Sequence, residues 1–414
     1  MKAALFCFEN IGQGLFYHGR LHGKHTDSFD FIYDCGSKSA IRYLHTAIDS
    51  YRPSVKKLEM VVISHFDEDH VNGVTRLISG KRVDRLILPY VTWAERLALR
   101  TMTKSQDNQY LLILEDPLTY FGGDNFDIGE IIVVGGPDQP PADNPDLFIP
   151  GPPLEQVAIN TETNELRVYI PSKALSDEDQ VTQLPRFTIA WDPTVVNPWK
   201  LSLYKSPFSL FVGAFWEFHF YNVEGTDSAK MMSFERDLRK WMAKEKLEPT
   251  DLFKDEHRST VRSIYTKHYS RLNQTSLILY HNAIEGQTNS AFTLNSVEYH
   301  PADEAVESTE NTGTLLTGDL SLSAKKTREN LLAFYKHRID RVGIFLVPHH
   351  AAKANWAFKH PSGLEDFEAY VVSAGVKRKH HPSPKVLDDI DAWCAGEIYH
   401  CHETCAYFYD VFLM

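Results

Sequence analysis

The densest group of chemically reactive side chains lies between Ser64 and Gly73. Four potential metal ligands fall within six positions there: His65, Asp67, Asp69 and His70. They directly follow the apolar run Leu58–Ile63, which has the composition of a buried strand. A loop that leaves the end of a strand can aim several side chains at one centre, and imidazole with carboxylate suits divalent transition metals. The spacing favours a metal site over an exposed acidic loop.

Two further groups of the same chemistry follow predicted strands later in the chain. Asp319 comes after Thr314–Thr317, and the pair His349 and His350 comes after Gly343–Val347. Layered α/β proteins usually place their chemistry in the cleft outside the strand ends. We therefore expect these side chains to join the first group.

Two basic segments could contact phosphate. Lys377, Arg378 and Lys379 lie just before a histidine, His381, and charges beside a metal cleft can clamp phosphate. The segment 229–271 holds eleven Lys and Arg against seven Asp and Glu. It is either a solvated helical surface or a nucleic-acid track in which Tyr265, His268 and Tyr269 interleave with the charges, and the sequence leaves both interpretations open. The C-terminal Cys394, His400, Cys401, His402 and Cys405 could bind a structural zinc or form a terminal strand region.

The elements that must position these residues alternate between short strands and helices. In the first 90 residues the pattern predicts strands at Ala3–Phe8, Leu15–Tyr17, Phe29–Tyr33, Leu58–Ile63 and Arg85–Leu88, with helices at Ile41–Ser50 and Val71–Ile78. Later strands are predicted at Phe208–Tyr221, Leu277–Tyr280, Leu315–Leu316, Gly343–Val347 and Tyr370–Ser373, with a helix at Ala324–Tyr335. Such alternation indicates an α/β layered fold.

The regular pattern lapses in the middle of the chain. Residues 137–153 contain seven prolines, which neither a helix nor a central strand tolerates. We interpret 1–90 and 208–414 as two halves of one domain and 91–207 as an insertion that includes the Pro-rich linker 137–153. The basic helical segment 229–271 belongs to the second half.

Composition limits the class of protein. The 414 residues carry a net charge of −12, which excludes a generally basic nucleic-acid coat but not a local basic patch. No run of 18 apolar residues and no signal-peptide pattern is present, so we expect a cytoplasmic protein without a membrane partner. The five cysteines, an odd number, are expected to be reduced thiols. The sequence does not indicate an oligomeric state.

The order of the motifs resembles the metallo-β-lactamase fold, and within it the hydrolase domain of ComEC-type DNA-uptake proteins. The matching segments are Asn10–Gly14, Tyr33–Gly36, His65–His70, Asn273–Leu277, Leu315–Asp319, Val347–His350, Ser373–Gly375 and His381-Pro382. Leu15 replaces an acidic residue of that pattern, and Ala351-Ala352 replace its usual Gly-Ser.

The resemblance implies a four-layer αββα sandwich, here with a large insertion, and a site that binds one or two divalent metal ions. The implied metal ligands are His65, Asp67, Asp69, His70, Asp319 and His381. Asp69, His349 and His350 would take part in catalysis. The residues that would orient the ligands from behind are Asp34, Asn273 and Ser276. The residues that would bind the substrate phosphate are Lys377, Arg378 and Lys379.

The implied chemistry is hydrolysis of a phosphodiester, and DNA is the expected substrate. Asp67 stands where most of the superfamily has a histidine, and the harder oxygen ligand favours Mn²⁺, with Zn²⁺ still possible. A small phosphodiester such as a cyclic nucleotide is an alternative, which the net charge favours because long duplexes need many phosphate contacts. A non-catalytic metal-binding regulatory protein of the same fold is a second alternative.

Overall fold

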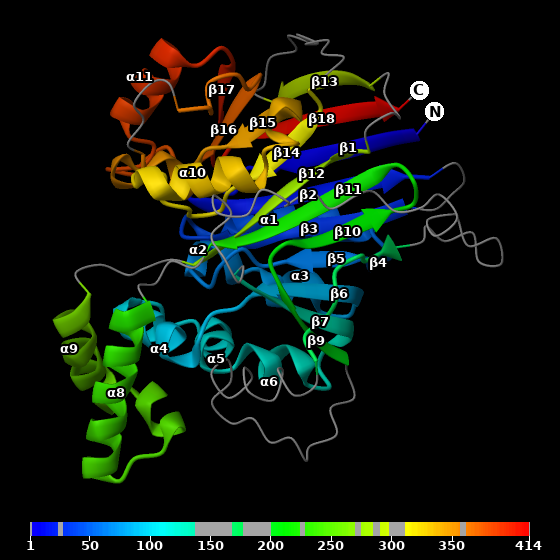
Figure 1. Cartoon of the computed structure of the whole chain (residues 1–414). Coiled ribbons are helices and arrows are strands. Elements are labelled where there is room, and N and C mark those ends of the chain that lie inside the picture. The colour runs from blue at the N-terminus through cyan, green and yellow to red at the C-terminus, as the bar shows by residue number, and fades with distance from the viewer. Residues whose placement is uncertain are drawn as a thin grey trace.

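In the computed structural model the described residues form two β-sheets packed face to face (Figure 1). The described residues are 2–23, 28–136, 168–176, 200–223, 228–269, 275–284, 290–297, 311–356 and 362–413. The predicted Pro-rich linker 137–153 lies outside them.

The first sheet has the order β13-β18-β1-β2-β3-β5-β6-β7-β9, with β4 beside β6. Its strands are β1 Lys2–Phe8, β2 Gly14–His22, β3 Ser28–Ser37, β4 Lys57–Leu58, β5 Met60–Val62, β6 Arg82–Pro89, β7 Asp127–Gly135, β9 Lys200–Lys205, β13 Ser290–Val297 and β18 Ala406–Leu413. The pairs from β3 to β9 are parallel, whereas β1, β2 and β18 pair antiparallel. Parallel strands are covered on both faces, which explains the uninterrupted apolar run of β5.

The second sheet has the order β17-β16-β15-β14-β12-β11-β10-β8. Its strands are β8 Val168–Tyr169, β10 Phe208–Val212, β11 Trp216–Val223, β12 Ser276–Ala283, β14 Gly313–Leu316, β15 Val342–Leu346, β16 Ala369–Ser373 and β17 Glu397–Cys401. The pairs from β14 to β17 are parallel, so their carboxyl ends meet along one edge of the sheet.

Helices cover the outer face of each sheet. The first sheet carries α1 Ile41–Tyr51, α2 Glu68–Val71, α3 Val74–Ile78, α4 Trp93–Met102, α5 Asn108–Glu115 and α6 Pro117–Gly122, and the second carries α10 Lys325–Phe334 and α11 Pro384–Trp393. Short 3₁₀ helices are η1 Arg52–Ser54, η4 Pro249–Phe253, η5 Asp255–His257, η6 Ile339–Arg341, η7 Pro348–Ala351 and η8 Lys353–Asn355. Apolar side chains such as Phe6 and Trp216 fill the space between the sheets, and two outer clusters lie beneath the helices. The predicted four-layer αββα sandwich is confirmed.

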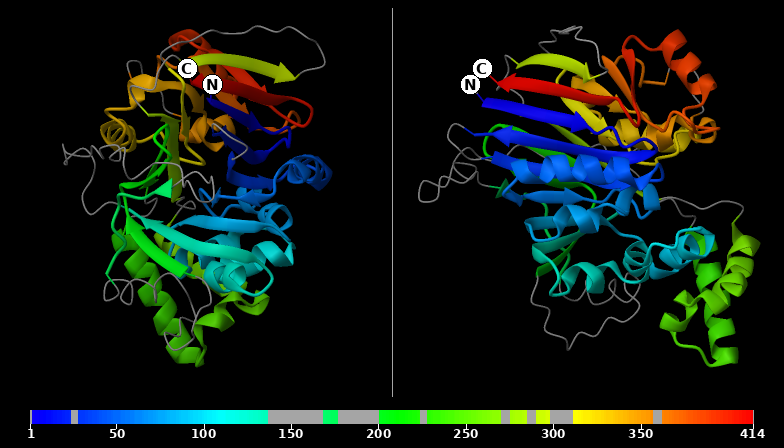
Figure 2. Two further views of the ribbon diagram at one scale, coloured as in Figure 1. Left: turned by 90° about the vertical axis from the view of Figure 1, so that its right-hand side faces the viewer. Right: turned by 180° about the vertical axis from the view of Figure 1, so that it is seen from behind.

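A helical arm projects beside α4 and contains α8 Ser228–Glu245 and α9 Arg258–His268 (Figures 1 and 2). The arm has its own apolar core, in which Phe234 and Val261 pack with Trp93 of α4. Tyr265 and Tyr269 are buried in this core, and His268 contacts Asp237 at 3.1 Å. These three side chains therefore serve the packing of the arm. Of the two interpretations that the sequence left open, a track along this segment would rest on its charged residues rather than on these rings.

A close backbone approach explains the glycine in the segment Tyr33–Gly36. Helix α2 crosses β3 so closely that a Cβ on Gly36 would lie 2.6 Å from the backbone nitrogen of His70. Any larger residue would push α2 away from the sheet. The absence of a side chain at Gly36 therefore lets α2 lie against β3, and this contact sets the position of the α2 residues.

Two sequence expectations differ from the structure. Phe208–Tyr221 forms a hairpin of two strands, because Gly213 turns the chain with φ at +53° although both strands remain apolar. Within 91–207, β7 and β9 extend the first sheet and α4 to α6 flank it, so the described part of this range belongs to the sandwich rather than to a separate insertion.

Candidate metal centre

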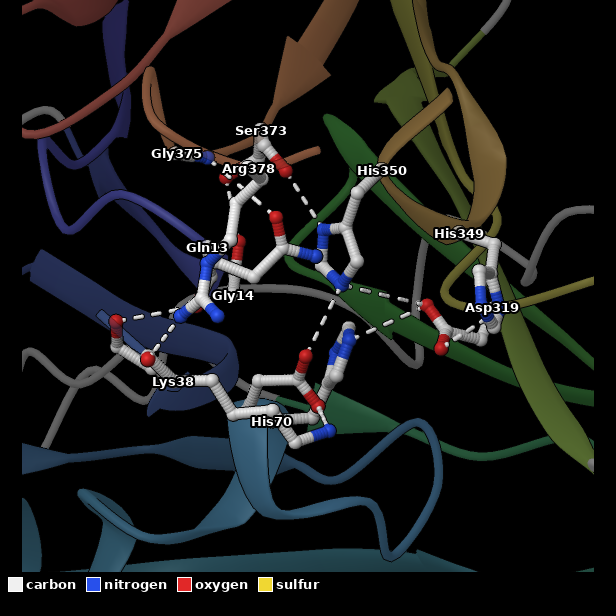
Figure 3. A network of polar contacts seen from close by, with 12 residues as sticks. Gln13, Gly14, Lys38, His70, Asp319, His349, His350, Ser373, Gly375 and Arg378 are labelled. Atoms are coloured by element: carbon white, nitrogen blue, oxygen red, sulfur yellow. Dashed lines mark hydrogen bonds and ion pairs between the residues drawn. The ribbon is translucent and has the colours of Figure 1, made fainter. Parts of the chain in front are cut away.

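Carboxylate and imidazole groups from five segments lie close together at the carboxyl ends of the strands. Figure 3 shows four of these groups, those of His70, Asp319, His349 and His350. The segment after β5 supplies His65, Asp67, Asp69 and His70, the end of β3 supplies Asp34, and the segments after β14, β15 and β16 supply Asp319, the pair His349 and His350, and His381. Potential ligand atoms of His65, Asp67 and Asp319 lie within 4.8 Å of one another, as do those of Asp69, His70 and His350.

Asp319 is the centre of this arrangement. Its Oδ2 lies 3.4 Å from His65 Nε2 and 3.0 Å from His349 Nδ1. Its Oδ1 lies 3.3 Å from His70 Nε2 and 3.8 Å from His350 Nε2. One buried carboxylate therefore lies close to four histidines. Two of them are near Oδ2 and the other two are near Oδ1.

Each of three histidines is oriented from behind by a hydrogen bond at Nδ1. His70 Nδ1 donates to Asp34 Oδ2 at 2.8 Å, and His350 Nδ1 donates to the Ser373 carbonyl oxygen at 2.6 Å. His65 Nδ1 lies 2.8 Å from Ser64 Oγ, whose hydroxyl donates to Asp34 at 2.5 Å. Acceptors behind Nδ1 hold the proton there, so the Nε2 lone pair of each ring faces the centre.

The atoms that face the centre lack hydrogen-bond partners among the described residues. They are His65 Nε2, His70 Nε2, His349 Nδ1, His350 Nε2, His381 Nδ1 and Asp319 Oδ1. Buried polar atoms without partners are rare, because each one costs about 1–3 kcal/mol. A divalent cation would satisfy nitrogen lone pairs and carboxylate oxygens together, so the donor set fits a metal.

Backbone strain is concentrated at the same place. Asp34, His349, His350 and Ala351 have φ of +60°, +50°, +53° and +59°, a left-handed conformation that residues other than glycine rarely adopt. Lys246 is the one further case among the described residues. Such strain persists where the surrounding structure enforces it, typically at active sites and ligand clamps.

The charges of the site are strongly coupled. Burial would raise the pKa of Asp319, but the histidines, His349 first, hold it well below its usual range. Burial would lower the pKa of His70, but Asp319 and Asp34 raise it well above the ordinary value. The carboxylates that stay ionised attract a cation, and an ion that binds here displaces the second proton from His70 so that Nε2 can act as a ligand.

Lys38 is a site residue that the sequence did not single out. Its Nζ donates to Asp69 Oδ1 at 2.6 Å, while Asp69 Oδ2 lies 3.4 Å from His350 Nε2. Burial would raise the pKa of Asp69, but Lys38 and His350 hold it well below the usual range. The only sequence signal was its position one residue after the end of β3.

The remaining predicted residues lie around this centre. The His381 ring lies 5.7 Å from that of His349 and 6.1 Å from that of His350, at the rim of the site. Lys377, Arg378 and Lys379 are exposed, and the Arg378 guanidinium donates to the Lys38 carbonyl oxygen (Figure 3). Ser276 is buried at the start of β12, where the next residue, Leu277, donates its backbone N–H to the Ser64 carbonyl oxygen. Asn273 lies outside the described residues.

The C-terminal cysteines and histidines do not form a potential metal cluster within the described chain. Cys401 faces the core between the sheets, and His400 contacts the Ala374 carbonyl oxygen. Cys394 caps the end of α11, and the other four residues lie in β17 and the turn into β18. The terminal strand region, the other interpretation of this segment, is what the structure shows.

Neither a scan against known protein families nor a search of curated proteins found a match. Matches among solved structures include the crystal structure of a long form RNase Z from yeast, with a TM-score of 0.30 and 10% sequence identity. The alignment covers 97% of this chain and 36% of that chain. A TM-score of 0.30 marks a remote likeness, so the fold assignment rests on the strand order and the layers described above. None of the described helices is long and apolar enough to cross a membrane.

Proposed function

We propose that this protein is a metal-dependent phosphodiester hydrolase of the ComEC-like branch of the metallo-β-lactamase fold, with DNA as its substrate. The observation that carries the proposal is the set of three histidines, His65, His70 and His350, held by hydrogen bonds at Nδ1 with Nε2 directed at Asp319. A protein without metal chemistry has no physical reason to strain its backbone and leave buried nitrogens unpartnered at one place.

The residues divide into two potential ligand groups. His65, Asp67 and Asp319 offer two carboxylates and one imidazole, whereas Asp69, His70 and His350 offer one carboxylate and two imidazoles. We propose Mn²⁺ at the first group, because two oxygen ligands favour a harder ion, and Zn²⁺ as the competing ion at the second. A divalent ion at such a site lowers the pKa of water that it binds and neutralises charge on phosphate oxygens.

The side chains of this chain supply the remaining chemistry. Asp69 would orient the attacking water through Oδ2, because Lys38 holds its other oxygen. His349 is partly exposed beside Asp319 and would give a proton to the leaving oxygen. Lys377, Arg378 and Lys379 would bind the substrate phosphate from the rim.

The proposal is tested with His70→Ala and Asp69→Ala, using His22→Ala at the opposite end of β2 as the matched control. We expect kcat/KM on a DNA oligonucleotide with Mn²⁺ to fall by about 10³-fold or more, which corresponds to about 4 kcal/mol of lost transition-state stabilisation. His70→Ala should also lower the bound metal measured by elemental analysis. Circular dichroism and thermal unfolding check the fold.

Undiminished hydrolysis by a folded His70→Ala protein would exclude the proposed site. Cleavage of cyclic dinucleotides in place of DNA would favour the small-phosphodiester alternative, for which the net charge of −12 is the supporting observation. A metal-loaded protein that hydrolyses neither substrate would favour the non-catalytic alternative.

A further inference from the structure

A groove of about 640 Å³ opens beside the metal centre. Asp67 and Glu68 of the metal-ligand segment form one wall, and the turn 103–107 between α4 and α5 forms the other. Leu99 and Tyr110 give it an apolar floor. The volume lies within the range of roughly 300–1,000 Å³ that small-ligand sites span, so the groove suits single nucleotide units rather than a duplex.

Three carboxylates and two lysines line this groove: Asp67, Glu68, Asp107, Lys38 and Lys104. Ser105 Oγ donates to Glu68 at 2.5 Å, and Asp107 accepts from the backbone N–H of Gln109 at 2.9 Å as the cap of α5. Lys38 is paired with Asp69. Lys104 is exposed and has no ion pair or hydrogen bond within the described part of the chain. A free cation on the wall of a cleft is available to a phosphate.

The turn 103–107 also joins the metal centre to the helical arm. Arg100 at the end of α4 contacts Asp255 at 2.8 Å, and Arg258 donates to the Thr101 carbonyl oxygen at 3.1 Å. The arm is therefore anchored one turn before Lys104, on the same side of the molecule as α2 (Figures 1 and 2).

The helical arm beside the groove carries a net positive charge. Its described residues, 228–269, hold ten Lys and Arg against seven Asp and Glu, a net charge of +3 in a chain whose total is −12. Arg236, Arg239 and Lys240 of α8 are exposed around a shallow hollow. Positive charge against a negative background marks the path of a polyanion.

We propose that a single-stranded segment of nucleic acid leaves the metal centre through this groove, with a backbone phosphate at Lys104 and the strand continuing onto the arm. Leu99 and Met102 provide apolar contacts for a base. Hydrogen bonds from neutral donors fix the Glu68 and Asp107 carboxylates but leave their charges, so Lys104 is the phosphate contact that this groove offers. The inference rests on the proposed function, because it takes the scissile phosphate to lie at the metal centre.

The test measures binding without hydrolysis. Fluorescence anisotropy with Mn²⁺ present would give Kd across a salt series for a 20-nucleotide single-stranded DNA with phosphorothioate linkages, which resist hydrolysis. The proteins compared are the wild type, Lys104→Ala and the matched control Lys56→Ala, which removes an exposed lysine next to β4 at the other end of the sandwich (Figure 1). Loss of one phosphate contact should raise Kd by about 4-fold near 0.15 M salt and reduce the salt slope by about 0.7. Lys104→Glu should have the larger effect, and Lys56→Ala should behave as the wild type.

Two results would overturn the inference. Equal Kd and salt slope for the wild type, Lys104→Ala and Lys104→Glu would show that no strand contacts this turn. An equal loss of affinity for a cyclic dinucleotide would show that the groove holds a compact ligand. RNA of the same sequence in a parallel series reports whether the 2′-hydroxyl matters, and thermal unfolding checks each variant.

The proposed function fails by a different measurement. Wild-type protein that retains no metal and does not hydrolyse bis(p-nitrophenyl) phosphate would refute the hydrolase, whatever the anisotropy shows. Normal hydrolysis of that small ester together with unchanged DNA binding by the Lys104 variants would refute only the strand path.

Discussion

At the scale of single residues, the run from His349 to Ala351 is the most strained segment of the described chain. Three consecutive residues other than glycine hold φ between +50° and +59°, and each such conformation costs about 1–3 kcal/mol. The turn places His349 against Asp319 and turns His350 toward the Ser373 carbonyl oxygen. This left-handed conformation allows two consecutive residues at one strand end to direct both imidazoles into the site.

Ala351 carries part of this strain without contributing a functional group. Ala351→Gly should be about 1 kcal/mol less destabilising than Ala352→Gly, because glycine adopts the φ of +59° at position 351 without steric cost. Ala352, with φ of −71°, is the matched control, because both alanines are buried and both substitutions remove a methyl group and raise unfolded-state entropy. Urea unfolding of both variants gives the comparison, and equal losses of stability would contradict the strain.

At the scale of elements, the loop from β16 to α11 is fastened to the loop after β3. The Glu403 carboxylate accepts from Val376 N–H at 3.0 Å and from Ser39 Oγ at 2.8 Å, and Arg378 donates to the Lys38 carbonyl oxygen. Arg378 therefore anchors this loop, whereas Lys377 and Lys379 are exposed and would act on a substrate through their charges.

The double variant Lys377→Gln/Lys379→Gln separates charge from anchoring. It should raise KM for a DNA substrate several-fold and reduce the salt slope of binding by about 1.4, since each lost phosphate contact with a single strand removes about 0.7. Lys385→Gln on α11, whose lysine pairs with Asp389, is the control and should leave both quantities unchanged. Identical salt slopes for the double variant and the wild type would remove these lysines from the substrate site.

The sequence predicted elements well where periodicity and turn residues agreed. The strand before His65 and a helix at Ile41–Ser50, observed as Ile41–Tyr51, were predicted from apolar spacing alone. Strand ends indicated where Asp319 and His350 would meet. The β10–β11 hairpin was missed because aromatic residues continue from one strand into the next across its turn. Lys38 and the Ser373 carbonyl oxygen were missed because long-range backbone and ion-pair contacts leave no local pattern.

At the scale of the whole molecule, a polar network lies between the two sheets. Tyr17 Oη lies 2.8 Å from His281 Nε2 and 2.5 Å from Tyr409 Oη, and Tyr409 contacts Thr314 at 2.5 Å. Burial lowers the pKa of His281 to about 3, so the folded protein holds this imidazole neutral. The network connects strands of both sheets through a ring that cannot take up a proton without cost.

Stability should therefore fall in acid. The unfolded chain binds a proton at His281 below pH of about 6.5, and the folded state does not until pH of about 3, so ΔG of unfolding should fall by up to about 1.4 kcal/mol per pH unit in this window. Urea unfolding of the wild type and His281→Gln at pH 7.5, 6 and 5 should show a difference in slope that amounts to about 2 kcal/mol at pH 5. Parallel pH profiles would exclude His281 as the titrating group.

The pairing of β1 with β18 also governs the order in which the molecule can assemble during synthesis. Lys2 lies opposite Leu413 in register, so the first strand waits for a partner made some four hundred residues later. Until β18 emerges from the ribosome, β1 presents an open edge to other chains, a recognised hazard for aggregation.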